Sequence, residues 1–322
     1  MAPYEKASTE ITMNPAAQPI ITIVGATATG KSDLALDLAQ RLGGEIINSD
    51  SMQFYRGMDI GTAKVPQRER RGIPHHLLDI LDVTEDADVK SYQSAARRLI
   101  VEIRERGKRP ILVGGSGLYT RAATDVMEFP PTDSALRARI EAAVSADRWA
   151  KYRELITLDP VAANKITAND TRRIVRALEV IALTGRPFSA QLPEYEQVVP
   201  TIQLGLTADR PVLHSRIDQR VDSMWANGWV QEVVELLERG LANGRTASRA
   251  IGYGQITSYL AGDITRDDAQ IATKTRTRQF ARRQETWFMR DPRTNWIDST
   301  SGDSKVNFEN AMGLIAQFEG FA

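Results

Sequence analysis

The sequence predicts an α/β fold, in which a mostly parallel sheet is flanked by helices and interrupted by an all-helical insertion. Short apolar segments alternate with amphipathic helical segments up to about residue 127, the pattern of strand–helix–strand units. Only helical patterns then follow, until an apolar alternation resumes at residue 201. The chain has 322 residues, more than the ~250–300 at which one hydrophobic core stops growing, so a main domain plus a smaller unit is expected.

The composition excludes several classes of protein. Hydrophobic residues make up 42% and charged residues 25% of the chain, which is typical of a globular protein and not of a disordered one. No apolar run approaches the ~18–20 residues of a membrane span, so we expect no membrane partner and a cytoplasmic location. The chain contains no cysteine, which removes disulfides, thiolate nucleophiles and Cys-based metal sites.

The elements of the main domain follow from local patterns. Residues 1–18 are polar and aperiodic, which predicts a disordered tail and not a signal peptide. Gly107 ends a helix that Asp88 should cap. We predict strands at 19–25, 45–48, 75–83 and 110–115, and helices at 31–42 and 88–106.

Three helical segments separated by turn signals make up the insertion. Their turn signals are Asp159–Pro160, Gly185–Pro187 and Pro193. We predict these helices at 133–144, 147–158 and 170–184, and a further strand at 201–208. The expected organisation is a main domain over 19–127 and 201–322, with a helical C-terminal half, and an insertion domain over 128–200.

Residues 25–32 match the phosphate-loop pattern GxxxxGK[ST] in full, between a predicted strand and a predicted helix. Glycines let the backbone wrap phosphate oxygens, the first N–H groups of the helix face them, and a lysine adds a point charge. The last hydroxyl of the pattern can coordinate Mg²⁺. The pattern predicts a di- or triphosphate site formed by Gly25, Ala26, Thr27, Ala28, Thr29, Gly30, Lys31 and Ser32.

The loop alone does not identify what carries the phosphate. A metal-binding aspartate should end an apolar strand in an ATPase, but the strand PILVGG runs into Gly-Gly-Ser. The segment Leu77–Asp82 has the right form without a special spacing, and the guanine-binding sequence Asn-Lys-x-Asp is absent. Phosphoryl transfer, as in a kinase, and transfer of another group both remain open on this reasoning.

Asp50 follows the second predicted strand, in the segment NSDSMQ. Because the carboxyl ends of parallel strands share one edge, Asp50 should lie beside the phosphate loop. It is either the N-cap of a helix over Ser51–Tyr55 or a general base that accepts a proton from a nucleophile. Ser116 is not a hydrolase nucleophile of the GxSxG type, because Leu118 stands where the second glycine is required.

Motifs along nearly the whole chain carry a family resemblance. Besides the phosphate loop they are SDSMQFYRGMDIGTAK (49–64), HHLLD (75–79), ILVGGSGLY (111–119), DPVAANKI (159–166), NDTRRIVRALEV (169–180) and RQFARRQETWF (278–288). In this order they resemble the tRNA dimethylallyltransferases, also called tRNA isopentenyltransferases. The chain departs from the family's GPTASGKT at Ala26, Thr29 and Ser32, and from its Gly-Gly-Thr at Ser116, while keeping the geometry or the hydroxyl.

The resemblance implies a fold and a reaction. The fold is a P-loop NTPase-like parallel sheet, and the reaction transfers a dimethylallyl group from dimethylallyl diphosphate to the exocyclic amine of the adenosine on the 3′ side of the tRNA anticodon. The resemblance makes Asp50 the general base and Ser116 a contact of the target nucleotide. Thr27, Lys31 and Arg220 would hold the diphosphate, and Ser32 would coordinate Mg²⁺. Arg216, one helical turn before Arg220, is the rival for the phosphate role.

Two basic clusters support an RNA partner independently of the family. Lys274–Arg293 holds seven basic and two acidic residues, a net +5, with aromatic residues interleaved. Lys165–Arg186 holds five basic and two acidic residues, a net +3. Such helices are either solvated faces over a buried aromatic stripe or RNA-binding surfaces, and the resemblance favours RNA. The whole chain has 41 basic and 41 acidic residues. This zero net charge therefore conceals an uneven distribution of basic and acidic residues along the sequence.

The resemblance also implies where the anticodon stem-loop binds. The expected RNA contacts are Asp50, Ser51, Met52, Gln53, Ser116, Arg137, Arg172, Arg173, Arg176, Arg249, Gly252, Tyr253, Arg278, Arg282, Arg283 and Arg290. The target adenosine would leave its stack and enter the protein from the side opposite the diphosphate. We therefore predict a channel through the main domain, lined at its middle by Asp50 and Ser116, in a protein that acts as a monomer.

Three other functions fit parts of the sequence. An adenylate isopentenyltransferase would act on free nucleotides, but the long insertion and the basic helices count against it. A P-loop small-molecule kinase would turn over ATP without RNA. An RNA-binding protein with a decayed phosphate loop is disfavoured, because Lys31, Ser32 and Asp50 are all intact.

Overall fold

A computed structural model describes residues 18–191 and 195–320 of the chain. The predicted disordered tail, apart from Gln18, lies outside the described residues, as does the predicted turn at Pro193. The chain divides into two compact units, one running up to Asp125 and again from Gln197, the other comprising Val126–Glu196. The second unit begins and ends a few residues before the predicted 128 and 200. None of the described helices is long and apolar enough to cross a membrane.

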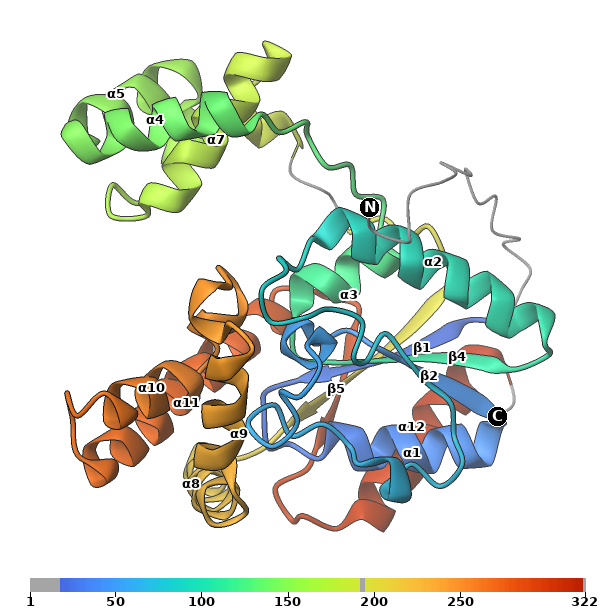
Figure 1. The fold of residues 1–322 in the computed structure, drawn as a ribbon. Helices are drawn as coiled ribbons and strands as arrows, with labels where there is room; N and C mark the ends of the chain where they lie inside the picture. Colours follow the sequence, from blue (N-terminus) through green and yellow to red (C-terminus); the bar gives the residue numbers. More distant parts are fainter. Residues whose placement is uncertain (1–17, 192–194, 321–322) are drawn as a thin grey trace. The chain divides into compact units, whose positions relative to one another are not determined.

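A six-stranded parallel sheet forms the centre of the main unit, with the strand order β3-β2-β4-β1-β5-β6 among the described residues (Figure 1). The strands are β1 (Ile20–Gly25), β2 (Gly44–Asn48), β3 (His75–His76), β4 (Arg109–Val113), β5 (Thr201–Thr207) and β6 (Thr294–Asp298). This arrangement confirms the predicted α/β fold. The prediction of a strand over 75–83 is wrong beyond His76, because Leu77 and Asp79 adopt φ values of 59° and 56°, which end an extended strand. Strand β6 was not predicted.

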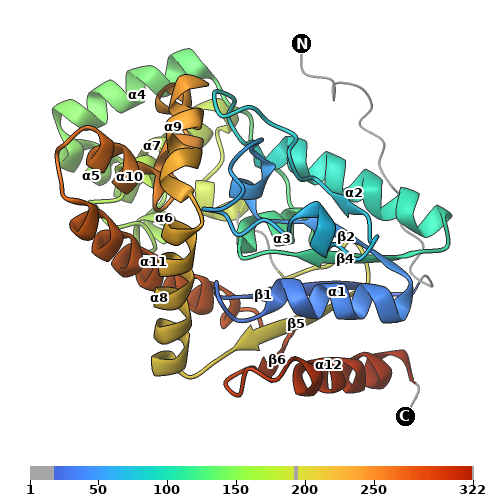
Figure 2. The ribbon, with the colours of Figure 1, turned by 60° about the horizontal axis from the view of Figure 1, so that its bottom comes forward.

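Helices cover both faces of the sheet. On one face lie α1 (Lys31–Leu42) and α12 (Ser304–Glu319), and on the other α2 (Val89–Glu105) and α3 (Gly117–Thr124) (Figures 1 and 2). Leu34 and Leu38, one helical turn apart, point from α1 into a core with Ile23 and Ile111. Asp88 caps α2, as predicted, by accepting the backbone N–H of Ser91.

Apart from α12, the helices of the C-terminal half gather at one end of the sheet (Figures 1 and 2). They are α8 (Arg210–Ala226), α9 (Trp229–Glu238), α10 (Tyr253–Leu260) and α11 (Arg266–Phe288), with 3₁₀ turns at Leu241–Asn243 and Ala247–Arg249. Trp225, Trp229 and Tyr253 form a second core there, which also buries Tyr55 from the segment after β2. Two further 3₁₀ turns, Ser51–Phe54 and Gln67–Glu69, lie in that segment.

The smaller unit is helical, with α4 (Ser134–Ala146), α5 (Arg148–Leu158), α6 (Pro160–Ala163), α7 (Thr171–Thr184) and a 3₁₀ turn at Phe188–Gln191. Aspartates at 133, 147, 159 and 170 cap these four helices by accepting a backbone N–H of the first turn. Leu155, Ile174 and Leu178 lie at its hydrophobic core.

The first segment of the main unit ends at Asp125, and its second segment begins beside it at Gln197. Asp125 and Gln197 form an antiparallel bridge, and the N–H of Val198 donates to Thr124 O at 2.9 Å. The buried Asp125 carboxylate accepts two hydrogen bonds from Arg293, at 3.0 and 2.9 Å, and one from Arg121. The two chain ends of the main unit are therefore fixed side by side.

Glu179 of α7 joins this helix to the beginning of α4. Its carboxylate is fully buried and accepts hydrogen bonds from Arg137 at 2.9 Å, from Arg176 at 2.8 Å and from the N–H of Asp133 at 3.0 Å. Burial alone would raise the pKa of Glu179, but the hydrogen bonds of Arg176 and Arg137 outweigh it and lower the pKa. Arg137 and Arg176 thus hold the helical unit together.

We expect Glu179→Ala to destabilise the helical unit by about 2–4 kcal/mol, because it leaves two partly buried guanidinium groups without their counter-charge. Because the folded pKa lies below the ordinary value, this stabilisation is present at neutral pH and is lost on acidification through the folded pKa. Hydrogen exchange of α4 and α7 measures the effect. Arg172→Ala, at an exposed position of α7, is the control, and equal effects of the two substitutions would contradict the role of Glu179.

Candidate active site

The carboxyl ends of three parallel strands meet around a cavity of about 510 Å³. Thr27 reaches it from the loop after β1, Asp50 from the residues after β2, and Ser116 from the loop after β4. The opposite walls come from α8, α10, α11 and the segment before α10. Their lining side chains include Arg220, Met224, Arg249, Tyr253, Phe280, Arg283 and Trp287. The cavity lies where we predicted the channel, and both Asp50 and Ser116 line it.

The phosphate loop has a backbone that only small residues permit. Gly25 has a φ of +134°, and a Cβ there would lie 2.3 Å from Leu206 O. Gly30 precedes α1 with a φ of +92°, and no side chain caps the first turn of α1. The N–H groups at the start of α1 are therefore left for an anion.

Lys31 lies in this loop with a strongly perturbed charge. Burial, together with the nearby positive charge of Arg220, lowers the pKa of Lys31 from 10.5 to about 7, against the opposing effect of Asp50. Its Nζ donates to Ala26 O at 2.5 Å, within the same loop. A bound anion would favour the charged form, so the loop holds a lysine whose protonation depends on its ligand.

Asp50 lies two residues after the end of β2 and lines the cavity. Its Oδ1 accepts the N–H of Met52 at 3.0 Å and caps the 3₁₀ turn at Ser51–Phe54, which confirms the capping hypothesis. In the part of the chain that the structure describes, Oδ2 has no hydrogen bond. Burial raises the pKa of Asp50, opposed by the Met52 hydrogen bond and by Lys31. The cap therefore leaves one carboxylate oxygen free to accept a proton.

The two candidate arginines of α8 differ in their partners. Arg216 donates to the carbonyl oxygens of Ser299 and Thr300, at 2.9 and 2.8 Å, and is held by that loop. Both arginines border a second cavity of about 400 Å³ beside Ala28–Gly30, but Arg220 also borders the main cavity and has no hydrogen bond or ion pair within the described ranges. Arg220 is therefore the guanidinium available to an anion on the phosphate loop.

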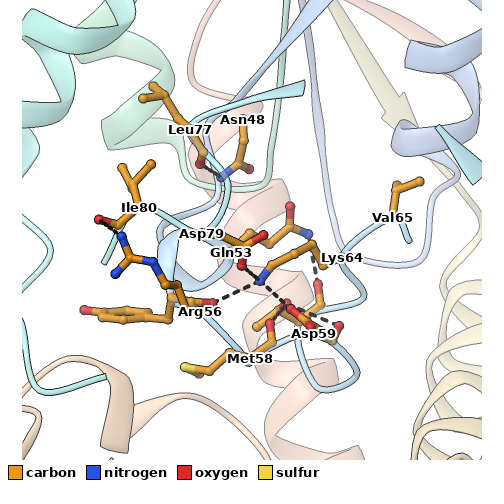
Figure 3. Close-up of polar contacts among 12 residues, drawn as sticks. Asn48, Gln53, Arg56, Met58, Asp59, Lys64, Val65, Leu77, Asp79 and Ile80 are labelled. Atoms are coloured by element: carbon orange, nitrogen blue, oxygen red, sulfur yellow. Dashed lines mark hydrogen bonds and ion pairs between the residues drawn. The ribbon is translucent and has the colours of Figure 1, made fainter. Parts of the chain in front are cut away.

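Lys64 fixes the loop GMDIGTAK, which contributes Gly61–Ala63 to the cavity wall. Its side chain is buried, and Nζ donates to Tyr55 O at 2.9 Å, Asp59 Oδ1 at 2.5 Å and Asp79 Oδ1 at 2.6 Å (Figure 3). The ammonium thus ties together three segments of the loop region that follows β2.

Glu232 of α9 holds the same loop from outside. Its carboxylate accepts the backbone N–H groups of Asp59, Ile60 and Gly61, at 2.9, 2.7 and 3.2 Å, and the hydroxyl of Tyr253 at 2.7 Å. Successive N–H groups around one carboxylate fix the loop backbone. Sequence reasoning missed Glu232, although the motif GMDIGTAK signals a loop that needs such a partner.

The described residues contain no cluster of three or more His, Asp or Glu side chains that could hold a metal ion. A magnesium ion would therefore need few protein ligands and several oxygens from a phosphate and from water, as this ion commonly has. The hydroxyl of Ser32, in the first turn of α1, makes no hydrogen bond to the described chain and lies beside a cavity of about 30 Å³ with Asn48 and Gln53. Ser32 fits such a site.

The predicted RNA contacts of the main unit separate into groups. Ser51, Met52, Arg249 and Arg283 line the cavity, and Arg282 and Arg290 are exposed on or just after α11. Gln53 instead donates to Thr62 O and borders the small cavity beside Ser32. Gly252 and Tyr253 are buried, and of the two only Tyr253 lines the cavity.

The charge of Lys274–Arg293 is partly neutralised. Lys274 pairs with Asp222, Arg278 with Asp218, and Arg293 with Asp125 and Asp291. The net +5 counted along the sequence therefore overstates the free positive charge, because three of its cations have acidic partners elsewhere. In the helical unit, Arg137 and Arg176 are bound by Glu179, whereas Arg172 and Arg173 are exposed.

Comparisons with known proteins agree on one family. The model of the family described as IPP transferase matches residues 53–291. A tRNA dimethylallyltransferase of Nocardioides is 57% identical over 281 residues, 87% of this chain and 91% of its relative. One of Streptomyces coelicolor is 54% identical over 302 residues, 94% of this chain and 97% of its relative.

Two solved structures are also similar. The tRNA isopentenylpyrophosphate transferase of Bacillus halodurans has a TM-score of 0.68 at 39% identity, covering 94% of this chain and 98% of that chain. A eukaryotic dimethylallyltransferase, described as acting on tRNA, has a TM-score of 0.80 at 31% identity, covering 92% of this chain and 78% of that chain.

We expect Glu232→Ala to lower the free energy of unfolding by about 2 kcal/mol, because three successive backbone N–H groups of the loop GMDIGTAK, including that of the cavity-lining Gly61, lose their acceptor. Urea unfolding measures the loss, and hydrogen exchange should show faster exchange at residues 59–61. Glu235→Ala, at an exposed position of the same helix, should cost about 0.5 kcal/mol or less. Equal losses in the two variants would argue against this anchoring role.

Proposed function

Because the chain belongs to the IPP transferase family, we propose that it transfers the dimethylallyl group of dimethylallyl diphosphate to the exocyclic amine of the adenosine on the 3′ side of the tRNA anticodon. The observation that carries this proposal is the single cavity at which the phosphate loop, Asp50 and unpaired arginines meet. An alkyl transfer to an amine would use the carboxylate to accept the proton of the amine, and the apolar part of the wall, which includes Met224 and Phe280, to hold the dimethylallyl group.

The diphosphate is the leaving group of the proposed reaction. As the bond between its oxygen and C1 of the dimethylallyl group breaks, the bonding electrons pass to that oxygen and negative charge accumulates. Thr27, Lys31, Arg220 and the free N–H groups of α1 would stabilise this charge in a poorly hydrated site. Mg²⁺, held by Ser32 and phosphate oxygens, would supply further positive charge when bound.

Asp50 would act as the general base. The exocyclic amine of adenine is a poor nucleophile, so its attack on C1 needs a group that orients it and takes its proton. The free Oδ2 of Asp50 can accept that proton as the new C–N bond forms, and its raised pKa makes it a stronger base than an exposed aspartate. Ser116 lies in the same cavity, and its hydroxyl does not cap α3. This hydroxyl can therefore hold the adenine ring of the target nucleotide.

RNA would be held by the arginines that have no acidic partner among the residues that the structure describes. In the main unit these include Arg249, Arg282, Arg283 and Arg290, and Arg172 and Arg173 are exposed in the helical unit. Arg283 stacks over Phe280, with 5.7 Å from its guanidinium carbon to the ring centroid, at the cavity wall. All of the proposed catalytic groups come from one chain, so a monomer suffices for the reaction.

Labelled dimethylallyl diphosphate with Mg²⁺, offered to tRNA, AMP or ATP, tests the function, and we expect label on tRNA alone. Label on AMP but not on tRNA would contradict the proposal, and phosphate release from ATP would favour a kinase.

In the same assay, Asp50→Asn should lower kcat by about 10²- to 10⁴-fold because it removes the general base while keeping an oxygen to cap the turn at Met52. Its affinity for tRNA should change less than about twofold. An equal loss of binding would make Asp50 structural.

Diphosphate binding should take up a proton at about pH 8, because free Lys31, with a pKa of about 7, is then mostly neutral and the bound anion raises its pKa above the pH of the experiment. Calorimetry in buffers of different ionisation enthalpy measures this uptake. Lys31→Arg keeps its charge at every accessible pH and should lack this contribution. The same proton uptake by both proteins would exclude Lys31 as its source.

A further inference from the structure

Gln284 of α11 lies between two of the loops that form the cavity. Its side chain is buried, at 5% exposure, and uses both ends of its amide. Oε1 accepts the N–H of Thr27 at 2.9 Å, and Nε2 donates to Gly115 O at 2.9 Å. Because β1 and β4 are neighbours in the sheet, these two loops lie side by side, and one glutamine spans them.

We propose that Gln284 is a positioning residue that sets the spacing between the diphosphate-binding loop and the Ser116 loop, and so aligns the leaving group with the nucleotide that attacks it. This inference deepens the proposed function and rests on it. Gln284 touches neither substrate in the proposal. It acts through Thr27 on one side and through Gly115, the neighbour of Ser116, on the other.

The hydrogen-bond pattern admits only one orientation of the amide. The N–H of Thr27 requires an oxygen and the carbonyl of Gly115 requires a donor, so a flipped amide would satisfy neither. Leucine, with a similar volume, would fill the space without either bond. The N–H of Thr27 would then lose its acceptor, and the loop would shift to hydrate it.

The glycines of GGSGLY make this contact possible. A Cβ on Gly115 would lie 2.0 Å from Gln284 Nε2, and a Cβ on Gly117 would lie 1.9 Å from Nε1 of Trp287. Gln284 and Trp287 are one helical turn apart and present the same face of α11 to this loop. The loop has glycine at both contact points, so that α11 can approach its backbone.

The same helix carries the arginines proposed to bind RNA. Arg283 precedes Gln284 directly and lines the cavity, while Arg282 is exposed. Helix α11 therefore presents one residue type to RNA and another to the loop that binds diphosphate. Substitution of Gln284 should alter diphosphate binding and leave the RNA-binding arginines in place.

The test measures the Kd of inorganic diphosphate with Mg²⁺, and separately the Kd of an anticodon stem-loop RNA, for the full-length protein and for Gln284→Leu. We expect the diphosphate Kd and the KM for dimethylallyl diphosphate to rise about tenfold, from one unsatisfied buried N–H. The RNA Kd should stay within about twofold. Gln203→Leu is the matched control, because Gln203 is a buried glutamine that bonds Thr294 and Asp291 outside the cavity.

Thermal unfolding of both variants separates stability from positioning. A fall in Tm common to both, with a raised diphosphate Kd only in Gln284→Leu, supports the proposal. An unchanged diphosphate Kd in Gln284→Leu overturns it, even if tRNA is prenylated, whereas a raised Kd supports it even if tRNA proves not to be the acceptor. Should Gln284→Leu fail to fold, Gly115→Ala displaces the same amide from the opposite side and should give the same rise in Kd.

Discussion

Two cations and a carboxylate crowd a poorly hydrated space at the carboxyl edge of the parallel sheet. Lys31, Arg220 and Asp50 each prefer water, and burial works against the charged form of each. Lys31 is near enough to Arg220 and to Asp50 for both of their charges to affect its pKa, so an anion that enters the site would also change its protonation. The surrounding loops must hold these groups together against that cost, and the rest of the structure can be understood from this requirement.

The loops meet the requirement through polar side chains that each bind several groups of the loops at once. Lys64 gathers three oxygens, Glu232 gathers three N–H groups and Gln284 joins one of each. Irregular backbone at the edge of a sheet has unpaired groups that cannot be left buried. These side chains satisfy them and at the same time fix the cavity wall, which is what a preorganised site requires.

Local signals predicted much of the fold and part of the site. The strand and helix around the phosphate loop, the cap at Asp88 and the position of Asp50 all follow from residues close together in sequence. Partners that are far apart in the sequence could not be predicted from local patterns. Glu232 lies more than 170 residues from the loop it binds, and Gln284 lies 257 residues from Thr27. The free charge of α11 was overstated for the same reason, since Asp218 and Asp222 belong to another helix.

The bridge between Asp125 and Gln197 has a consequence for how the inserted segment can vary in evolution. The main unit leaves off at Asp125 and resumes at Gln197; Arg293 binds the Asp125 carboxylate, and backbone pairing holds Asp125 and Gln197 side by side. Closing a chain between adjacent ends costs little more for a long segment than for a short one. Inserts of different length can therefore be accommodated between Asp125 and Gln197, while the strand pairing of the sheet stays the same.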